Sequence, residues 1–382
     1  MNRLSVELSE AAVVSNLAAV RRLVGPDTVL MGVVKADAYG HGLVPFSRLL
    51  VRHGVGHLAV AHAEEAFRLR EAGIDVPVLV LGHVAAADLP GLIRSGVRQT
   101  VYAESQARAL SRAATALGRP ARVHLEFDTG LCRYGLDPAD TDALARITAL
   151  DDLVVEGLCT HLSGTAPELV DEQLARFDVA CRAATALLGR RPARHVLASP
   201  GIAAGLHRRT AMEMVRPGIL LYGLGPSHSP ALLPDLPEFR PVLSMTSRIE
   251  QLRQVPAGTP VGYGASWTPA RPAVVATVPV GFADGLPKAL GGRGRVLVGG
   301  VRVPVVGQVG MGHLNVDVTR VPRAATGDEV VLLGDRPGQR LGVQEWADAA
   351  GTINTEVLVR LAPATPRTVR QLPYSTEQER CA

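Results

Sequence analysis

The chain has 382 residues, a formal net charge of +4, 47% hydrophobic residues and 4% aromatic residues. Its arginines are scattered among acidic residues, so the sequence offers neither a basic block nor stacking aromatics for nucleic acid. No segment approaches the roughly 18 unbroken apolar residues of a membrane span, and residues 1–10 lack the apolar core of a signal peptide. These features predict a cytoplasmic protein with no nucleic-acid or membrane partner.

The cysteine pattern gives no sign of a metal site or a disulfide framework. Cys132, Cys159, Cys181 and Cys381 are far apart and form no CxxC pair. Such spacings are typical of reduced thiols rather than of zinc ligands or disulfides. We therefore predict no bound metal.

In chain order, residues from about 9 to 235 alternate β-branched runs with amphipathic, Ala/Leu/Arg-rich stretches. The expected strands are 29–34, 57–61, 76–81, 99–101, 122–127, 154–159, 195–197 and 214–221. The expected helices are 12–23, 43–52, 63–72, 105–117, 139–149, 167–188 and 201–206. Eight strands alternating with helices predict an α/β fold with an N-terminal (β/α)8 TIM-like barrel, and a doubly wound sheet is the structural alternative.

The amino-acid composition changes around residues 223–241, which are rich in Pro and Gly and predict a linker. Short Val-rich runs follow, separated by Gly, Pro and Asp, and they predict a mainly-β domain. Its expected strands are 242–250, 273–280, 295–298, 301–306 and 329–333, with one helix at 344–350. We place the domains at 1–236 and 237–382, with a polar tail at 374–382.

The stretch VVKADAYGHG, residues 33–42, places Lys35 at the end of an expected strand, facing a loop. Lys35 and Lys288 are the only two lysines of the chain. A partly desolvated lysine amine can form a Schiff base, which an arginine guanidinium cannot; an ordinary structural lysine is the alternative. The stretch resembles the pyridoxal-phosphate motif of alanine racemases, whose Lys carries the cofactor and whose Tyr, here Tyr39, helps to hold its phosphate.

The segment EFDTGLCRYG, residues 126–135, closes the fifth expected strand. An Asp-Thr-Gly turn there would direct Arg133 across the barrel mouth, where a guanidinium can bind a carboxylate or phenolate, although a surface salt bridge is the alternative. In alanine racemases a similar DTG-x-x-R segment supplies the Arg that contacts cofactor and substrate carboxylate. Seven residues before that Arg the family often carries a carbamylated Lys, and Glu126 stands there. We hypothesise that Glu126 orients Arg133.

Two further strand ends carry polar side chains. His161 follows the strand at 154–159. A histidine at such a position is usually a core residue whose ring nitrogens are hydrogen-bonded within the protein. The family has a TH at this point, which makes His161 a candidate to lie against the cofactor ring. The resemblance also gives Ser199 a phosphate contact, although the Asn expected before it is Ala198.

The segment MVRPGILLYG, residues 214–223, matches a second family motif. Gly218 allows a close backbone approach, so the N–H groups of Gly218 and Ile219 are candidates to bind phosphate. In the family the Arg of this motif, here Arg216, donates to the pyridine nitrogen and weakens the cofactor as an electron sink. That property suits an enzyme that only removes and returns one proton.

In the second half, VGYGASW resembles a family segment whose Tyr is the second catalytic base, delivered from the other subunit of a dimer. The resemblance assigns this role to Tyr263, although a Tyr between glycines is otherwise an ordinary turn residue. Met311, retained in a loosely matching motif, is implied as a substrate-binding residue. Polar positions of the family's entrance corridor are changed, and the residues present are Phe282, Lys288, Gln308, Gly312 and Pro167.

The resemblance covers nearly the whole chain and implies a fold-type III pyridoxal 5'-phosphate enzyme that forms a homodimer with shared active sites. The expected reaction interconverts L- and D-alanine for cell-wall precursor supply. One alternative is a racemase of a larger or polar amino acid, suggested by the altered corridor. Another is a cofactor-carrying homologue without racemase activity, which Tyr263 argues against. A decarboxylase on a related barrel is disfavoured by Arg216, because those enzymes place an acidic residue at the pyridine nitrogen.

Overall fold

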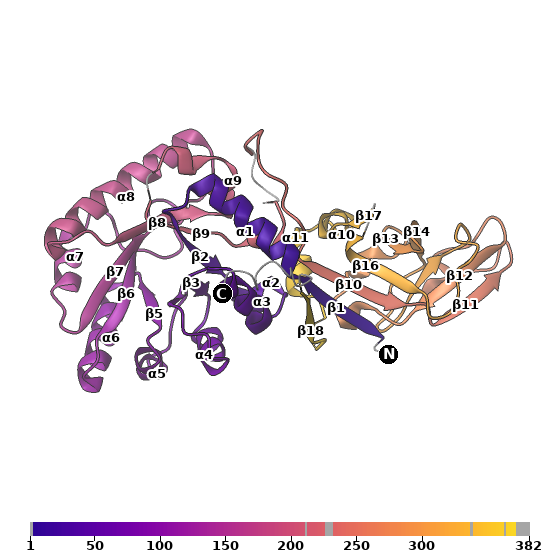
Figure 1. Ribbon diagram of the computed structural model, residues 1–382, viewed down its shortest axis with the longest axis horizontal. Coiled ribbons are helices and arrows are strands. Elements are labelled where there is room, and N and C mark those ends of the chain that lie inside the picture. The colour runs from indigo at the N-terminus through magenta and orange to yellow at the C-terminus, as the bar shows by residue number, and fades with distance from the viewer. Residues whose placement is uncertain (1–2, 211, 226–231, 337–338, 363, 372–382) are drawn as a thin grey trace, which may run out of the picture. The chain divides into compact units, whose positions relative to one another are not determined.

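The computed structural model describes residues 3–210, 212–225, 232–336, 339–362 and 364–371. The chain divides into two compact units, whose elements are labelled in Figure 1. The barrel unit comprises Val14–Ala38 and Phe46–Phe239, and the sheet unit comprises Met1–Val13, Tyr39–Pro45 and Arg240–Ala382. The expected polar tail at 374–382 and part of the expected linker at 223–241 lie outside the described residues.

Eight parallel strands close into a barrel in the barrel unit. They are β2 (Val29–Val33), β3 (His57–Val60), β4 (Val78–Val80), β5 (Arg98–Val101), β6 (Ala121–Glu126), β7 (Leu153–Cys159), β8 (Ala193–Ala198) and β9 (Met214–Arg216). The sheet is closed because β2 pairs with both β3 and β9. The predicted TIM-like barrel is therefore confirmed, and the doubly wound alternative is wrong.

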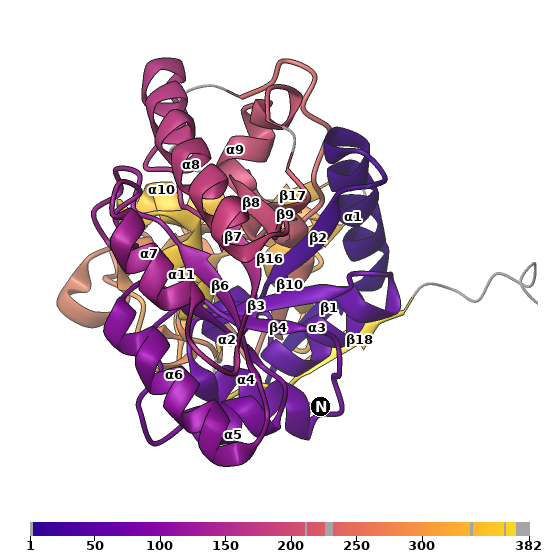
Figure 2. The same ribbon diagram turned by 90° about the vertical axis from the view of Figure 1, so that its left-hand side faces the viewer.

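Helices follow the strands along this part of the chain. They are α1 (Glu10–Val24), α2 (Lys35–Tyr39), α3 (Leu43–Arg52), α4 (Ala63–Glu71), α5 (Leu89–Arg94), α6 (Glu104–Leu117), α7 (Thr141–Thr148), α8 (Pro167–Leu188) and α9 (Ser199–Ala203). Figure 2 shows α5–α8 outside the barrel strands. On α6 the buried residues recur at helical spacing, namely Ala107, Leu110, Ser111 and Ala114. This stripe is the face that a helix needs in order to pack on a sheet.

The last barrel strand is shorter than the sequence predicted. We expected a strand over 214–221, but β9 ends at Arg216 and the 3-10 helix η2 spans Ile219–Tyr222. Pro217 explains the early end, because it has no N–H to donate to a neighbouring strand. Tyr222 then anchors the turn: its hydroxyl donates to Val33 O at 2.9 Å, and its ring stacks on Phe46 with centroids 4.4 Å apart.

The sheet unit is mainly β, as predicted, and its strands follow the order β11-β12-β15-β14-β13-β16-β10-β1-β18, with β17 paired to β16. Their bounds are β1 (Leu4–Ser9), β10 (Leu243–Arg248), β11 (Gln251–Val255), β12 (Ala273–Val278), β13 (Arg295–Val298), β14 (Val301–Val306), β15 (Leu314–Asp317), β16 (Glu329–Arg336), β17 (Gln339–Leu341) and β18 (Arg367–Arg370). The helices of this unit are α10 (Val343–Ala350) and α11 (Asn354–Val359).

The first strand of the chain belongs to this sheet. β1 pairs antiparallel with β10 and parallel with β18, so the two ends of the described chain lie side by side in one sheet. Short 3-10 turns, η1 (Leu206–Arg208) in the barrel unit and η3 (Tyr263–Ala265), η4 (Phe282–Asp284) and η5 (Lys288–Leu290) in the sheet unit, complete the elements.

Candidate active site

Five barrel strands end in polar residues that the sequence had singled out. Lys35 comes just after β2, Glu126 ends β6, His161 comes two residues after β7, Ser199 follows β8, and Arg216 ends β9. Because all eight strands are parallel, their carboxyl ends share one rim of the barrel. Active sites of this fold are built at that rim, so the fold itself brings these side chains to one place.

The backbone after Lys35 forms a left-handed turn. Ala36, Asp37, Ala38 and Tyr39 have φ angles of 54°, 52°, 54° and 51°. None of them is glycine, and each left-handed non-glycine residue costs roughly 1–2 kcal/mol. Four such residues in a row at the carboxyl end of a barrel strand are a strained segment at the expected position of an active site.

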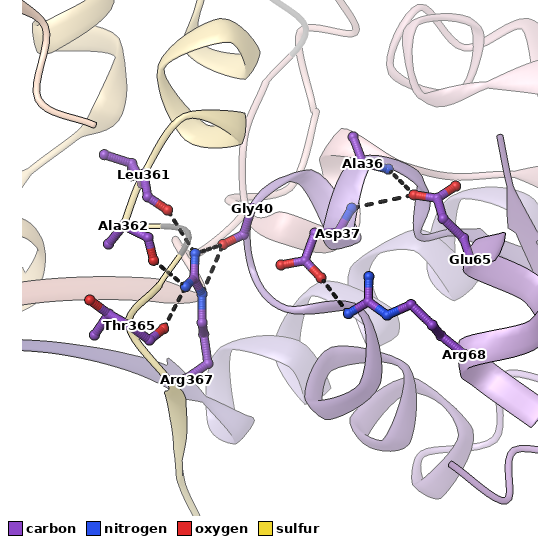
Figure 3. Close-up of polar contacts among 9 residues, drawn as sticks. All are labelled: Ala36, Asp37, Gly40, Glu65, Arg68, Leu361, Ala362, Thr365 and Arg367. Atoms are coloured by element: carbon purple, nitrogen blue, oxygen red, sulfur yellow. Dashed lines mark hydrogen bonds and ion pairs between the residues drawn. The ribbon is translucent and has the colours of Figure 1, made fainter. Parts of the chain in front are cut away.

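Gly40 ends this turn and is held within the sheet unit (Figure 3). The Arg367 guanidinium donates to Gly40 O from Nη2 at 2.7 Å and from Nε at 3.2 Å. A Cβ on Gly40 would lie 2.1 Å from Leu358 O, so the position requires glycine. The neighbouring Tyr39 is half-buried, and burial raises the pKa of its phenol to about 12.

Lys35 is half-buried, and the pKa of its amine is lowered. Burial is the largest cause, followed by the positive charge of Arg133, while Glu65 acts in the opposite direction. Arg216 lowers the pKa of Lys35 as well. A lysine in these surroundings holds a larger neutral fraction near neutral pH than an exposed one, and a neutral amine is the form that acts as nucleophile or base.

Arg216 is 5% exposed and is held by acceptors from two neighbouring strands. Its Nη1 donates to His195 Nδ1 at 2.7 Å and to His195 O at 2.6 Å. Its Nη2 donates to Thr160 O at 2.9 Å, to Val196 O at 3.2 Å and to His161 Nδ1 at 3.1 Å. Among the described residues Nε has no partner. Burial lowers the pKa of Arg216, but a guanidinium starts so high that it stays protonated at neutral pH.

The histidines around Arg216 are neutral. Burial, followed by the charge of Arg216, lowers the pKa of His161 to about 3 and that of His195 well below its usual range. Arg216 only donates, so Nδ1 of His195 accepts and its Nε2 carries the proton. That Nε2 lies 2.7 Å from His124 Nδ1, which accepts in turn. Gly157 leaves room for this pair, since a Cβ there would lie 2.5 Å from His124 Nδ1.

The residues around the start of η2 present backbone N–H donors after the last two barrel strands, and two of these donate to Ser199. Ser199 is buried, and its Oγ accepts from Gly218 N at 2.9 Å and from Leu220 N at 3.4 Å. Ile219 lies between these two residues. The loops after the seventh and eighth strands of a TIM barrel are the usual phosphate-binding region of this fold, and here these strands are β8 and β9.

Asp128 builds the loop that carries Arg133. Its Oδ1 accepts from the N–H groups of Gly130 at 2.9 Å and of Leu131 and Cys132 at 3.0 Å each. Arg133 itself is exposed, and its guanidinium carbon lies 6.0 Å from the ring centroid of Tyr134. The loop backbone is therefore fixed, while the guanidinium is accessible to a ligand.

Glu126 is a buried carboxyl, 7% exposed, and burial raises its pKa. The positive charges of Arg216 and Arg133 act in the opposite direction. Among the described residues, no hydrogen bond or ion pair joins the Glu126 side chain to Arg133. The hypothesis that Glu126 orients Arg133 stays a prediction. The charges of Arg216 and Arg133 act to lower the pKa of Glu126 against the effect of burial, although neither guanidinium contacts its carboxyl among the described residues.

The remaining predicted residues lie mainly in the sheet unit. Tyr263 is 75% exposed on η3, and Met311 is 66% exposed in the loop before β15. Phe282 N donates to Gly310 O at 3.0 Å, which joins its loop to that of Met311. Phe282 and Lys288 both line a pocket of about 520 Å³. Gln308 and Gly312 do not line this pocket; Gln308 is exposed and Gly312 is half-buried in the sheet unit, while Pro167 begins α8 of the barrel unit.

Two residues near the carboxyl rim of the barrel were not predicted from the sequence. His124 lies two positions before Glu126 on β6, so the period of two along a strand would have placed both side chains on the same face. Glu65 is the third residue of α4, a position at which a glutamate usually caps its own helix, so nothing local pointed to Lys35. None of the helices that the structure describes could span a membrane, and among the same residues no three His, Cys, Asp or Glu side chains are grouped as metal ligands would be.

Comparisons with known proteins agree with this arrangement. A protein-family model described as the N-terminal domain of alanine racemase matches residues 8–226. A second family model, described as the C-terminal domain of alanine racemase, matches residues 242–369. The chain belongs to the alanine racemase family. The expected membership and the expected enzyme class, a racemase, are therefore confirmed.

Relatives cover almost the whole chain. An alanine racemase of Syntrophobacter fumaroxidans is 40% identical over 364 residues, which cover 92% of this chain and 93% of that protein. A solved structure of alanine racemase from Clostridium difficile 630 has a TM-score of 0.90 at 30% identity, covering 97% of this chain and 96% of the other. A histidine racemase from Leuconostoc mesenteroides has a TM-score of 0.87 at 26% identity, covering 97% and 98%.

Proposed function

We propose that this member of the alanine racemase family is a pyridoxal-phosphate-dependent racemase that interconverts L- and D-alanine. The observation that carries the proposal is the placement of Lys35, with a lowered pKa, at the carboxyl rim of the barrel together with Arg216 and Arg133. A small amino acid offers a carboxylate and a Cα proton, and this rim offers a cation and a base for them.

The residues present fit pyridoxal phosphate. Lys35 offers an amine for its aldehyde carbon, while the Ile219 N–H and the hydroxyls of Ser199 and Tyr39 offer donors for its phosphate. The Gly218 N–H would join them by exchanging its present acceptor, Ser199 Oγ, for a phosphate oxygen. Arg216 is held by five contacts on its two terminal nitrogens, and its remaining donor, Nε, has no partner among the described residues. That donor suits the ring nitrogen. His161, neutral and half-buried beside Arg216, suits the face of an aromatic ring.

The bound cofactor would supply an electron sink that acidifies the Cα proton of an amino acid. Arg216 would limit that sink, since a protonated guanidinium that donates to the ring nitrogen would discourage the nitrogen from taking a proton. A limited sink favours removal and return of one proton over decarboxylation. Arg133 would bind the substrate carboxylate, and Met311 would contact the substrate.

Racemisation requires one group to remove the α-proton from one face and another to supply a proton from the opposite face. Lys35 would exchange the proton of the D-isomer, and Tyr263 of the partner subunit that of the L-isomer. In this proposal residues 1–236 form the cofactor-binding domain, and residues 237–382 form the domain that delivers Tyr263 to the partner in a homodimer.

A second candidate is a racemase of a larger or polar amino acid. It is favoured by the changed corridor positions, since Phe282, Lys288, Gln308, Gly312 and Pro167 replace polar groups expected there. One of the similar solved structures, from Leuconostoc mesenteroides, carries the name histidine racemase rather than alanine racemase. A cofactor carrier without racemase activity is the third candidate, and Tyr263 argues against it because a carrier needs no second base.

Chiral chromatography of L-alanine incubated with the cofactor-loaded protein tests the proposal. We expect conversion to a 1:1 mixture of isomers, lost in Lys35→Ala and kept in Lys288→Ala, which removes the other lysine. Conversion of L-histidine or another larger amino acid in preference to alanine would support the second candidate. A loaded protein that converts no amino acid would contradict both racemase proposals.

A further inference from the structure

We propose that Glu65 is a positioning residue for Lys35: its carboxylate holds the left-handed turn that follows Lys35 and thereby fixes the direction of the Lys35 amine. The inference rests on the proposed role of Lys35 as cofactor attachment point and base. It adds a residue that lies on α4, thirty positions further along the chain, and that acts on Lys35 through the backbone.

Both carboxylate oxygens of Glu65 accept backbone N–H donors, and the two oxygens serve different loops. Oε1 accepts from Ala36 N at 2.6 Å and from Asp37 N at 3.4 Å (Figure 3). Oε2 accepts from Ala61 N at 2.9 Å and from His62 N at 3.3 Å. Glu65 therefore ties the loop after β2 to the loop after β3, two strands that are neighbours in the barrel.

The turn after Lys35 needs such a partner. Ala36, Asp37 and Ala38 all have left-handed φ and ψ angles, which non-glycine residues adopt only when their surroundings impose them. Ala38 N donates to Val34 O at 2.9 Å, which closes the turn, but the N–H groups of Ala36 and Asp37 point out of it to Glu65. A carboxylate is the stronger kind of acceptor for such groups.

A cap for its own helix is the simpler explanation of Glu65. Glu65 is the third residue of α4, and His62 precedes the helix, so Oε2 makes the usual reciprocal contact with the His62 N–H. That contact occupies one oxygen only. The 2.6 Å contact of Oε1 with Ala36 N reaches a different loop, directly after Lys35, and helix capping does not account for it.

A second contact between the same elements is weaker. Arg68 Nη2 lies 3.4 Å from Asp37 Oδ1, and both side chains are more than 40% exposed. An exposed pair at this distance adds little, because water screens it. Glu65 therefore holds the turn, and Arg68→Gln serves as a control that removes an ionic contact to the same turn.

Three variants separate positioning from capping. Glu65→Asp keeps the charge, but it is one methylene shorter and reduces the reach of both oxygens, to Ala36 and to His62. Glu65→Gln keeps the length, but its amide group can accept on one side only. Glu64→Gln removes an exposed neighbouring carboxylate and is the matched control. Thermal unfolding of each variant shows whether the fold is kept.

The first measurement is amide hydrogen exchange, read by mass spectrometry, on the full-length protein without cofactor. We expect the segment with Ala36 and Asp37 to exchange at least about tenfold faster in Glu65→Asp, because hydrogen bonds to a charged acceptor are lost. Exchange in the segment with Ala61 and His62 reports the cap of α4 separately. Unchanged exchange at Ala36 and Asp37 in both Glu65 variants would overturn the proposal.

The second measurement is steady-state kinetics with α-deuterated alanine. A misdirected Lys35 should lower kcat by about 10- to 100-fold and leave KM nearly unchanged. The step that uses Lys35 then becomes the slower one, so the deuterium isotope effect should rise with D-alanine and fall with L-alanine. Equal isotope effects in parent and Glu65→Asp would contradict the positioning role.

The two measurements distinguish this inference from the proposed function. If the parent protein racemises no amino acid, the proposed function fails, while faster exchange at Ala36 in Glu65→Asp would still show that Glu65 holds the turn. If the parent is active and Glu65→Asp matches it in both exchange and isotope effects, Glu65 only caps α4 and the inference fails alone. Arg68→Gln and Glu64→Gln should match the parent in both.

Discussion

Arg216 and His195 form a buried donor–acceptor pair, with Nη1 of the arginine 2.7 Å from Nδ1 of the histidine. The guanidinium can only donate, so it fixes His195 as a neutral acceptor, and burial lowers the pKa of that imidazole well below its usual range. His195 in turn donates to His124, 2.7 Å away. The permanent charge of Arg216 thus defines the protonation of a row of side chains inside the barrel.

Removal of the His195 acceptor should destabilise the fold. His195→Leu leaves Arg216 Nη1 and His124 Nδ1 each without a side-chain partner inside the barrel, and we expect it to lower the free energy of unfolding by about 2–4 kcal/mol. His195→Asn keeps an acceptor at the place of Nδ1 and should cost less. Urea unfolding of both variants measures the difference. Equal losses of unfolding free energy in the two variants would show that the contact of His195 with Arg216 does not stabilise the fold.

Lys35 should be the point of cofactor attachment. Borohydride reduction of the loaded parent should fix the cofactor as a mass increase on the peptide with Lys35. Lys35→Ala should show no such increase, while Lys288→Ala should match the parent, since Lys288 lies in the sheet unit. An adduct that persists in Lys35→Ala would move the attachment to Lys288, the only other lysine.

Glu126 should make stability depend on pH. Its pKa is raised above the ordinary 4.5 by burial, so the folded protein favours the protonated carboxyl. That contribution is complete at low pH and is lost as the pH rises from about 4.5 through the raised value. Glu126→Gln should therefore match the parent at low pH and be more stable near pH 7, on the order of 1 kcal/mol, because a buried amide costs less than a buried carboxylate.

Urea unfolding of Glu126→Gln at several pH values checks this sign, with the exposed Glu64→Gln as control. A variant that is less stable than the parent at pH 7 would show that the charges of Arg216 and Arg133 outweigh burial. The same variant tests the orienting hypothesis: weaker substrate binding with unchanged cofactor binding would support a role of Glu126 toward Arg133, and unchanged activity and affinity would contradict it.

Tyr263 and Lys35 should belong to the same active site but to different subunits. Tyr263→Phe should slow removal of the α-proton from L-alanine by about 10²- to 10⁴-fold, the usual contribution of a positioned base. Lys35→Ala should be inactive as well. When the two variants are unfolded together and refolded, mixed dimers contain one intact site, and about a quarter of the parent activity should return. If no activity returns, the sites are not shared.

The barrel could be predicted because each of its strands and helices is marked by residues that are close together in the sequence. The run VLV of β4 is buried throughout, as strands covered on both faces are, and the 22 residues of α8 were bounded correctly by Pro167 and the Gly189 that follows Leu188. The end of β9 was missed, because the apolar residues Ile219, Leu220 and Leu221 continue past Pro217. β1 was missed because its partners, β10 and β18, lie more than 230 residues away.

The positions of Lys35, His161, Ser199 and Arg216 followed from strand ends and family motifs, whereas their partners did not. Nothing in the sequence KADAY, which contains no glycine, predicts a left-handed turn. The contact of Glu65 with Ala36 depends on two loops that meet only in the closed barrel. The three-residue row of Arg216, His195 and His124 likewise joins strands whose spacing along the chain carries no fixed period.

The most direct test of the racemase proposal is deuterium incorporation at Cα in heavy water, measured by mass spectrometry with chiral separation for a panel of L- and D-amino acids. We predict exchange with inversion on alanine, and with it one deuteron in each newly formed isomer. Exchange with inversion only on a larger amino acid would identify the changed corridor residues as determinants of specificity. No exchange on any amino acid by the cofactor-loaded protein would contradict a racemase function.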